Sequence, residues 1–298
     1  MNNNSAGLNH SWEKYKTLSA ISRNIKNEYI KWSKVVFGLG ILGAIFGTLA
    51  QEFQSTVSTD TGPKILGGLS ALCLGLAGYF SKEILNPQTQ KDWIRARSMA
   101  ESIKSQIYLY LSRTSPYDNE NPHSLLVEKT AALNLYDGEL PTVQLTEEEK
   151  TKHLPTEPFG ITNYINDRVQ DQINNFYNIR AAEYQSLMDR FKKFTWGLGS
   201  LAIILGTLQT ASGFSGFAVW IAVITTIISS ISAYLGSQRY QYLVFSYQAT
   251  SKRLQSLLAS WETQKPSFRE EQKNIGQFIM DCEEAISVEN SSWMTQLK

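Results

Sequence analysis

Three glycines near the start of the chain have the spacing of a phosphate-binding turn. Gly38, Gly40 and Gly43 form the pattern G-x-G-x-x-G within the stretch FGLGILGAIFGTLAQ. In a dinucleotide-binding domain these glycines join a buried strand to a helix whose N-terminus binds the pyrophosphate, and an acidic residue follows about 20 positions later. A cofactor site is therefore expected only if a strand precedes the glycines.

The residues before the glycines have the pattern of a helix. Apolar side chains recur there three or four positions apart among many charged ones, which is typical of an amphipathic helix. They are Trp12, Tyr15, Leu18, Ile21, Ile25 and Tyr29. A polar helix that runs into an apolar one leaves no strand–turn–helix unit. We therefore expect no dinucleotide cofactor and interpret the glycines as helical residues.

The other residues that could carry chemistry are scattered. His10, His123 and His153 lie in separate polar segments, and the sequence contains no C-x-x-C or H-E-x-x-H motif, whereas zinc sites need clustered ligands. Cys73 lies in an apolar segment and Cys282 in a polar one, so no disulfide is expected, which fits a reducing compartment. We predict no metal site, no cofactor and no catalytic residue, and expect a protein that is not an enzyme and has no nucleic-acid partner.

Long apolar segments predict membrane-spanning helices. No charged residue occurs in 35–50, 65–80 or 194–236. A helix rises about 1.5 Å per residue against a hydrocarbon core of about 30 Å, so the first two segments must be extended at their ends to span it. The predicted spans lie at about 35–53, 65–85, 194–210 and 214–236. The alternative is a soluble protein with four buried core helices, although such helices usually carry a polar stripe.

Small residues in these segments predict close contacts between helices. Gly43 and Gly47 are four positions apart, as are Ala202 and Gly206. This spacing lets backbones approach closely where lipid gives helices no hydrophobic reason to associate. The glycines expected to serve in helix packing are Gly40, Gly43, Gly47, Gly75 and Gly206.

The apolar stretch at 37–51 recurs at 196–210 as WGLGSLAIILGTLQT, with most glycines and leucines in register. We therefore predict an all-α membrane protein whose four transmembrane helices form two hairpins, duplicated, with long cytoplasmic helices that form a helical bundle. The predicted parts are a first repeat at 1–112, a Pro-rich acidic linker at 113–160 with a short helix at 124–135, and a second repeat at 161–298. No proline or glycine occurs in 161–194, which predicts one continuous helix that enters the third span.

Basic residues near the helix ends predict the orientation in the membrane. Lysines and arginines precede the first and third spans and follow the second and fourth, whereas the turns within the hairpins carry few charges. By the positive-inside rule, the N-terminus, the middle of the chain and the C-terminus are expected in the cytoplasm. No cleavable signal sequence is expected, because the first apolar run begins only at Val35.

Four sequence segments, called the four phrases below, lie beside the two predicted hairpins: DWIRARSMAESIKSQIYLYL, YINDRVQDQINNFYNIRAAEYQ, SYQATSKRLQSLLASW and CEEAISVENSSWM. In this order the phrases and hairpins resemble the SLATT family of bacterial two-transmembrane effectors, in a tandem form. The resemblance implies an oligomeric, pore-forming effector of bacterial conflict or anti-phage systems. It also implies activation by a nucleotide-derived second messenger and a location in the bacterial inner (cytoplasmic) membrane.

One face of the fourth predicted span carries small hydroxyl side chains. They are Thr225, Thr226, Ser229, Ser230 and Ser232, three or four positions apart or in adjoining rows. Such a face would line a pore if several copies surrounded an axis. The alternative is that the hydroxyls hold helices together, since serine and threonine are also enriched at helix contacts. No charged residue lies inside the apolar core of any span, which disfavours a proton- or ion-coupled transporter.

Charged residues after the second span suggest a ligand site. Arg95, Arg97, Glu101 and Lys104, repeated around an oligomer, would form a cytoplasmic vestibule that attracts anions or a nucleotide. The alternative is ordinary positive flanking of a span combined with helix pairs to Glu101. Together these features predict a homo-oligomer in the lipid bilayer that acts as a pore-forming channel or effector gated through its cytoplasmic helices. The alternative function is a non-conducting scaffold or sensor assembled through those helices.

Overall fold

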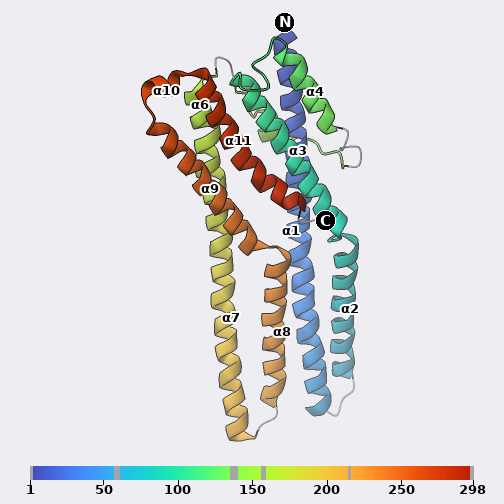
Figure 1. The fold of residues 1–298 in the computed structure, drawn as a ribbon. Coiled ribbons are helices and arrows are strands. Elements are labelled where there is room, and N and C mark those ends of the chain that lie inside the picture. Colours follow the sequence, from blue (N-terminus) through green and yellow to red (C-terminus); the bar gives the residue numbers. More distant parts are fainter. Residues whose placement is uncertain (1–2, 57–60, 135–139, 156–158, 214–215, 296–298) are drawn as a thin grey trace. The chain divides into compact units, whose positions relative to one another are not determined.

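The computed structural model describes residues 3–56, 61–134, 140–155, 159–213 and 216–295, and every regular element within these residues is a helix (Figure 1). Four of the helices are long and apolar enough to cross a membrane. The predicted class, an all-α membrane protein with four span-forming helices, is therefore confirmed. The duplication of the hairpins and the cytoplasmic bundle stay predictions.

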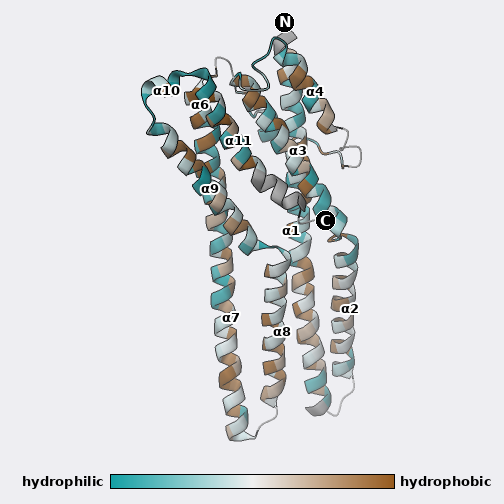
Figure 2. Ribbon diagram, viewed as in Figure 1, coloured by the Kyte–Doolittle hydropathy of each residue, from teal (hydrophilic) through white to brown (hydrophobic). Residues whose placement is uncertain are grey.

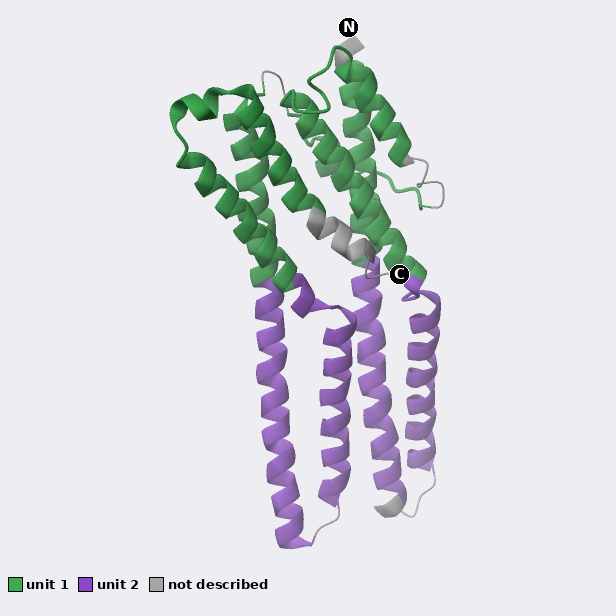
Figure 3. Ribbon diagram, in the orientation of Figure 1, with its two compact units in different colours: residues 1–27, 88–182, 244–298 green, residues 28–87, 183–243 purple. Residues whose placement is uncertain are grey.

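The helices fall into two compact units, shown in Figure 3. Unit 1 comprises residues 1–27, 88–182 and 244–298, and unit 2 comprises residues 28–87 and 183–243. Each unit is therefore built from separate parts of the chain. The predicted division into 1–112, 113–160 and 161–298 follows the chain instead, and it stays a prediction.

Unit 2 holds the apolar helices. They are α1 (Asn3–Thr56) from residue 28 onward, α2 (Thr61–Glu83), α7 (Asn178–Ser212) from residue 183 onward, and α8 (Gly216–Ser237). Figure 2 shows brown and pale residues along α8 with few hydrophilic ones. Residues 214–215 of the fourth predicted span lie outside the described residues. α2 ends at Glu83 and Pro87 begins the next helix, and the predicted span at about 65–85 stays a prediction.

Two kinds of contact hold the helices of unit 2. Between α1 and α2, the Ser70 hydroxyl donates to the Gly43 carbonyl oxygen at 2.7 Å, and the rings of Trp32 and Phe80 lie 4.7 Å apart. On α8, the buried Tyr234 ring lies 5.0 Å from the Phe37 ring of α1. The helices of unit 2 are thus held together by small residues and aromatic rings.

Unit 1 holds the more polar helices. Beside the first part of α1 these are α3 (Pro87–Leu111) from residue 88 onward, α4 (Pro122–Asn134), α5 (Glu147–Lys150), α6 (Ile161–Tyr164), the π-helical segments η1 (Ile165–Gln170) and η2 (Gln172–Tyr177), α9 (Tyr240–Glu262) from residue 244 onward, α10 (Pro266–Glu270) and α11 (Gln272–Thr295). The apolar face predicted for the first helix is buried at Trp12, Tyr15 and Leu18. Fully buried Ile103, from α3, adds to this core.

Two predictions about individual helices can be compared with unit 1. The continuous helix predicted from residue 161 is present, because Ile161–Ser212 forms one uninterrupted helical run. The short helix predicted at 124–135 is α4, which begins at Pro122, where a proline without an N–H suits the first helical turn. Residue 135 lies outside the described residues.

Candidate functional site

A fully buried ion pair joins η1 to α11 in unit 1. Arg168 is 0% exposed and donates from Nε to Glu283 Oε1 and from Nη2 to Glu283 Oε2, both at 2.9 Å. The Tyr164 hydroxyl donates to Glu283 Oε1 at 3.0 Å. Two parallel bonds from a guanidinium to a carboxylate are strong and fix the geometry of both groups. Burial raises the pKa of the Glu283 carboxyl, but the Arg168 charge and these bonds outweigh burial, so the pKa lies below its ordinary value.

A second carboxylate approaches the same guanidinium from α3. Glu101 Oε2 lies 3.6 Å from Arg168 Nη1, and neither of these two atoms has a hydrogen-bond partner in the described part of the chain. The Arg168 guanidinium also lies 5.1 Å from the Tyr108 ring. Burial acts to raise the pKa of Glu101, but the charges of Lys104 and Arg168 lower it below its ordinary value. The pair therefore stays ionised at neutral pH.

A polar cavity of about 700 Å³ lies within unit 1. Its lining includes Trp12 from α1, Lys104 and Tyr108 from α3, and residues 152–155 from the segment after α5. The η1–η2 segment contributes Asn166, Asp167, Gln170, Asp171, Asn174 and Asn175. The η1–η2 residues of the wall are exposed or half-buried, so the cavity opens to solvent. Its volume lies in the range typical of small-molecule sites, although its lining is unusually polar.

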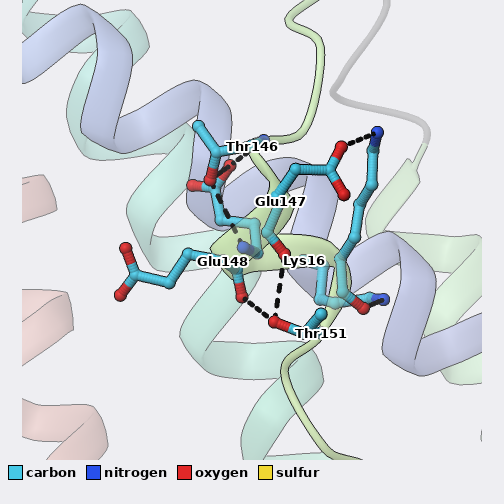
Figure 4. A network of polar contacts seen from close by, with 7 residues as sticks. Lys16, Thr146, Glu147, Glu148 and Thr151 are labelled. Atoms are coloured by element: carbon cyan, nitrogen blue, oxygen red, sulfur yellow. Dashed lines mark hydrogen bonds and ion pairs between the residues drawn. The ribbon is translucent and has the colours of Figure 1, made fainter.

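The acidic run TEEEK forms α5, which lies against α1 in unit 1 (Figure 4). Thr146 and Glu149 form a capping box, in which each side chain bonds to the backbone N–H of the other residue. Lys16 of α1 donates to the Lys150 carbonyl oxygen at 3.3 Å, and Arg23 of α1 lies 3.3 Å from Glu149. This part of the predicted linker is thus bound to a helix, and it positions the residues that follow it.

Lys152 is held in the cavity wall by α1. Its ammonium donates to the Tyr15 hydroxyl at 2.8 Å and lies 5.0 Å from the centre of the Tyr15 ring. Its carbonyl oxygen accepts from the Trp12 indole N–H at 3.2 Å. Burial lowers the pKa of Lys152 below its ordinary value, although the charge of Glu101 opposes this change. The Lys104 ammonium also lies near the Tyr15 ring, 5.7 Å from its centre.

The four residues predicted as a vestibule all lie on α3, but they separate into different surroundings. Lys104 lines the cavity, whereas Glu101 lies next to Arg168. Arg97 donates to the Tyr247 hydroxyl at 3.1 Å, and Arg95 is half-buried outside the cavity lining. A vestibule formed by several copies stays a prediction.

The predicted hydroxyl face lies on α8 and points away from the helix's buried face. Thr225, Thr226, Ser229 and Ser232 are exposed in the single chain, and Ser230 is half-buried. The hydroxyls of Thr225, Thr226, Ser230 and Ser232 donate to the carbonyl oxygen four residues earlier, at 2.8 to 3.0 Å. Such back-bonding satisfies the hydroxyl hydrogens within the helix, while each oxygen can still accept a hydrogen bond from water or a neighbouring subunit. The pore-lining role stays a prediction.

The predicted packing glycines also differ in their surroundings. A Cβ atom at Gly43 would lie 2.8 Å from Leu74, and one at Gly47 would lie 3.0 Å from the Ser70 hydroxyl oxygen. At Gly206 the nearest atom, from Ile221, would lie at an ordinary 3.8 Å. Gly40 and Gly75 would meet no described atom within 4 Å in the single chain, so contacts at these two positions would require another molecule.

Sequence reasoning missed Arg168, Glu283, Tyr164 and Lys152. The pattern T-x-x-E at Thr146 is a local signal for a capping box and would have identified α5. No comparable signal predicts the ion pair, because Arg168 and Glu283 are 115 positions apart. Only the packing of α11 against η1 brings them together.

Two family models match separate parts of the chain. Residues 164–293 match the model described as "SMODS and SLOG-associating 2TM effector domain 1", known as SLATT_1, and residues 10–125 match DUF4231, a protein family of unknown function. No curated protein and no solved structure matches the chain significantly. The resemblance indicated by the four phrases is confirmed, because residues 164–293, which include both Arg168 and Glu283, match the SLATT_1 model.

Proposed function

We propose that this protein is an effector of bacterial defence that assembles as a homo-oligomer in the inner membrane and forms an ion-conducting pore. The match of residues 164–293 to a family described as two-transmembrane effectors supports the effector role. Four helices of sufficient length and apolarity support insertion into the bilayer. The basic residues at the span ends support cytoplasmic N- and C-termini.

The exposed hydroxyl face of α8 is the observation that best supports the proposed pore. Val223, Ile224 and Ile231 are buried on one side of α8, while Thr225 and Ser229 are exposed on another. Lipid offers no partner to hydroxyl groups, so a face of this kind favours either water or a neighbouring subunit. A ring of copies that turn this face toward a shared axis would enclose a polar path without fixed charges.

We further propose that the pore opens in response to a nucleotide-derived messenger that acts on the helices of unit 1. This unit contains the polar cavity and the buried ion pair, so it offers the protein groups that a soluble ligand can contact. The second candidate function is a non-conducting scaffold or sensor. The back-bonded hydroxyls of α8 favour this second function, because their hydrogens are already bonded within the helix and need no water as an acceptor.

The test is ion flux from liposomes that contain the purified protein. The variant Ser229→Leu places an apolar side chain on the hydroxyl face and is expected to abolish flux, because a hydrophobic constriction excludes water. Ile227→Leu, a half-buried position away from that face, is the matched control and should conduct as the wild type does. Light scattering on the same samples reports whether the oligomer is intact.

Either result separates the two candidates. Flux that Ser229→Leu loses and Ile227→Leu keeps supports the pore. Intact oligomers without flux, both with and without cyclic dinucleotides or other nucleotides, would assign the protein to the scaffold class.

A further inference from the structure

The two sides of the cavity in unit 1 differ in charge. Its cationic side chains, Lys104 and Lys152, come from α3 and from the segment after α5. Its carboxylates, Asp167 and Asp171, come from η1 and from the residue between η1 and η2. The cavity is therefore lined by ammonium groups from α3 and the segment after α5 and by carboxylates from the η1–η2 segment, within a single unit.

The cationic wall is organised around one aromatic ring. The ammonium groups of Lys104 and Lys152 lie 5.7 Å and 5.0 Å from the centre of the Tyr15 ring, which is itself buried. Lys152 uses one donor on the Tyr15 hydroxyl, and an ammonium carries three. Two ammonium groups held against a rigid ring are suited to the oxygens of a phosphate, which lysine binds as a point charge.

The η1–η2 wall of the cavity is rich in groups that bond to hydroxyls and amines. Asn166, Gln170 and Asn174 offer both a donor and an acceptor each, and the carboxylates of Asp167 and Asp171 accept only. Carboxylates would repel a bare anion but accept hydrogen bonds from hydroxyl groups. A volume of about 700 Å³ also exceeds what an inorganic ion needs.

We propose that this cavity binds a small hydroxyl-bearing organic phosphate, with the phosphate between Lys104 and Lys152 and the hydroxyls against the η1–η2 wall. Binding does not depend on whether the protein conducts ions. If the proposed pore is correct, the ligand would contact the helical run Ile161–Ser212, which continues into the third predicted span. A free sugar or nucleoside phosphate and a glycerophosphate lipid headgroup share this chemistry.

Calorimetric titration of the full-length protein in detergent tests the proposal. Ribose 5-phosphate and adenosine monophosphate are expected to bind at least tenfold more tightly than inorganic phosphate or ribose, since only the first two engage both walls. Lys104→Gln removes one of the two positive charges of the cationic wall and should weaken binding by tenfold or more. Lys91→Gln, an exposed lysine on the same helix, is the matched control and should bind as the wild type does.

Two further arms complete the test. Asn174→Leu changes an exposed side chain of the η1–η2 wall, so it should weaken binding without affecting the fold. This variant tests the site even if Lys104→Gln is unstable. Nanodiscs with phosphatidylglycerol, compared with nanodiscs of phosphatidylcholine alone, test the lipid source. Loss of lipid binding in Lys104→Gln supports the same site with a headgroup as its ligand.

Two results would overturn the proposal. One is that neither soluble organic phosphates nor phosphatidylglycerol bind the wild-type protein. The other is binding that Lys104→Gln and Asn174→Leu both leave unchanged. These readouts are independent of flux, so a failed pore and a failed phosphate site are distinguishable.

Discussion

The two compact units of this protein use different interactions to hold their helices. Unit 1 buries Arg168 and Glu283 and joins them by two hydrogen bonds of 2.9 Å. Unit 2 has no charged residue within 35–50, 65–80 or 194–236, and its helices meet through Gly43, through a serine hydroxyl and through aromatic rings. The comparison shows that one chain holds its polar helices by charge and its apolar helices by close approach.

This difference has a physical reason. Charges can be buried in a polar unit because partners and hydrogen bonds compensate for the lost water, whereas lipid supplies no such compensation. In lipid, close contact between backbones is the main source of attraction between apolar helices. Each unit should therefore be sensitive to a different kind of substitution.

The largest effect is expected when Glu283 is replaced by alanine. This change removes the carboxylate that accepts both guanidinium hydrogen bonds and leaves buried Arg168 with only the longer 3.6 Å contact to Glu101, which should destabilise unit 1 by about 3–5 kcal/mol. Cys282 is 0% exposed and burial raises the pKa of its thiol, so its reaction with a maleimide reports opening of unit 1. In a Cys73→Ser background, Glu283→Ala should accelerate this labelling strongly.

Glu284→Ala is the matched control for that substitution, because Glu284 is the exposed neighbour of Glu283. It should leave the labelling rate of Cys282 unchanged. Equal labelling rates in the two variants would show that the ion pair does not stabilise unit 1.

A smaller loss of stability is expected in unit 1 at low pH. The pKa of Glu283 lies below its ordinary value of 4.5 in the folded protein, so the folded state holds this proton more weakly than the unfolded state does. The stabilisation is therefore complete above pH 4.5 and is lost as pH falls through the folded pKa. Hydrogen exchange by mass spectrometry should show α11 becoming less protected below this pH.

The same experiment contains its own comparison. Glu283→Gln should remove much of the pH dependence in α11, because glutamine does not titrate. The uncharged α8 of unit 2 should keep its protection over the same range. Parallel loss of protection in α8 would contradict the separation of the two units.

In unit 2, Gly43→Leu is expected to destabilise the contact between α1 and α2 by about 1–3 kcal/mol, as overpacking does. The first side-chain atom alone would come within 2.8 Å of Leu74. Thermal unfolding in detergent measures the change. Gly40→Leu, on the same helix with open space around it, is the control and should unfold as the wild type does. A changed oligomer size in that variant would show that Gly40 contacts another copy of the chain.

The smallest effect is expected at Gly206, which aligns with Gly47 in the repeated stretch. An added Cβ would meet Ile221 at 3.8 Å, which is ordinary contact. Gly206→Ala should therefore stabilise α7 by up to about 1 kcal/mol, because alanine favours a helix more than glycine does. A lowered melting temperature would show that Gly206 contacts a neighbouring molecule in the assembly.

Much of the fold was predictable because its signals are local. The apolar periodicity at Trp12, Tyr15 and Leu18 identified a buried helical face, and all three side chains are buried. The lack of proline and glycine in 161–194 identified a continuous helix. Of the candidate ligand site, only Lys104 was predicted, since its partner Lys152 lies in a segment that composition indicated to be a linker.

The sequence by itself determined that this chain is helical and carries four segments able to span a membrane. Uncharged runs of this length must satisfy every backbone hydrogen bond internally, and a helix does so within its own segment. Only the tertiary structure decided which charges are paired and which glycines are in close contact. Arg168 meets Glu283 across 115 positions. Gly47 and Gly206 occupy equivalent positions in the repeated stretch but have unlike neighbours, because such contacts depend on which helices pack together.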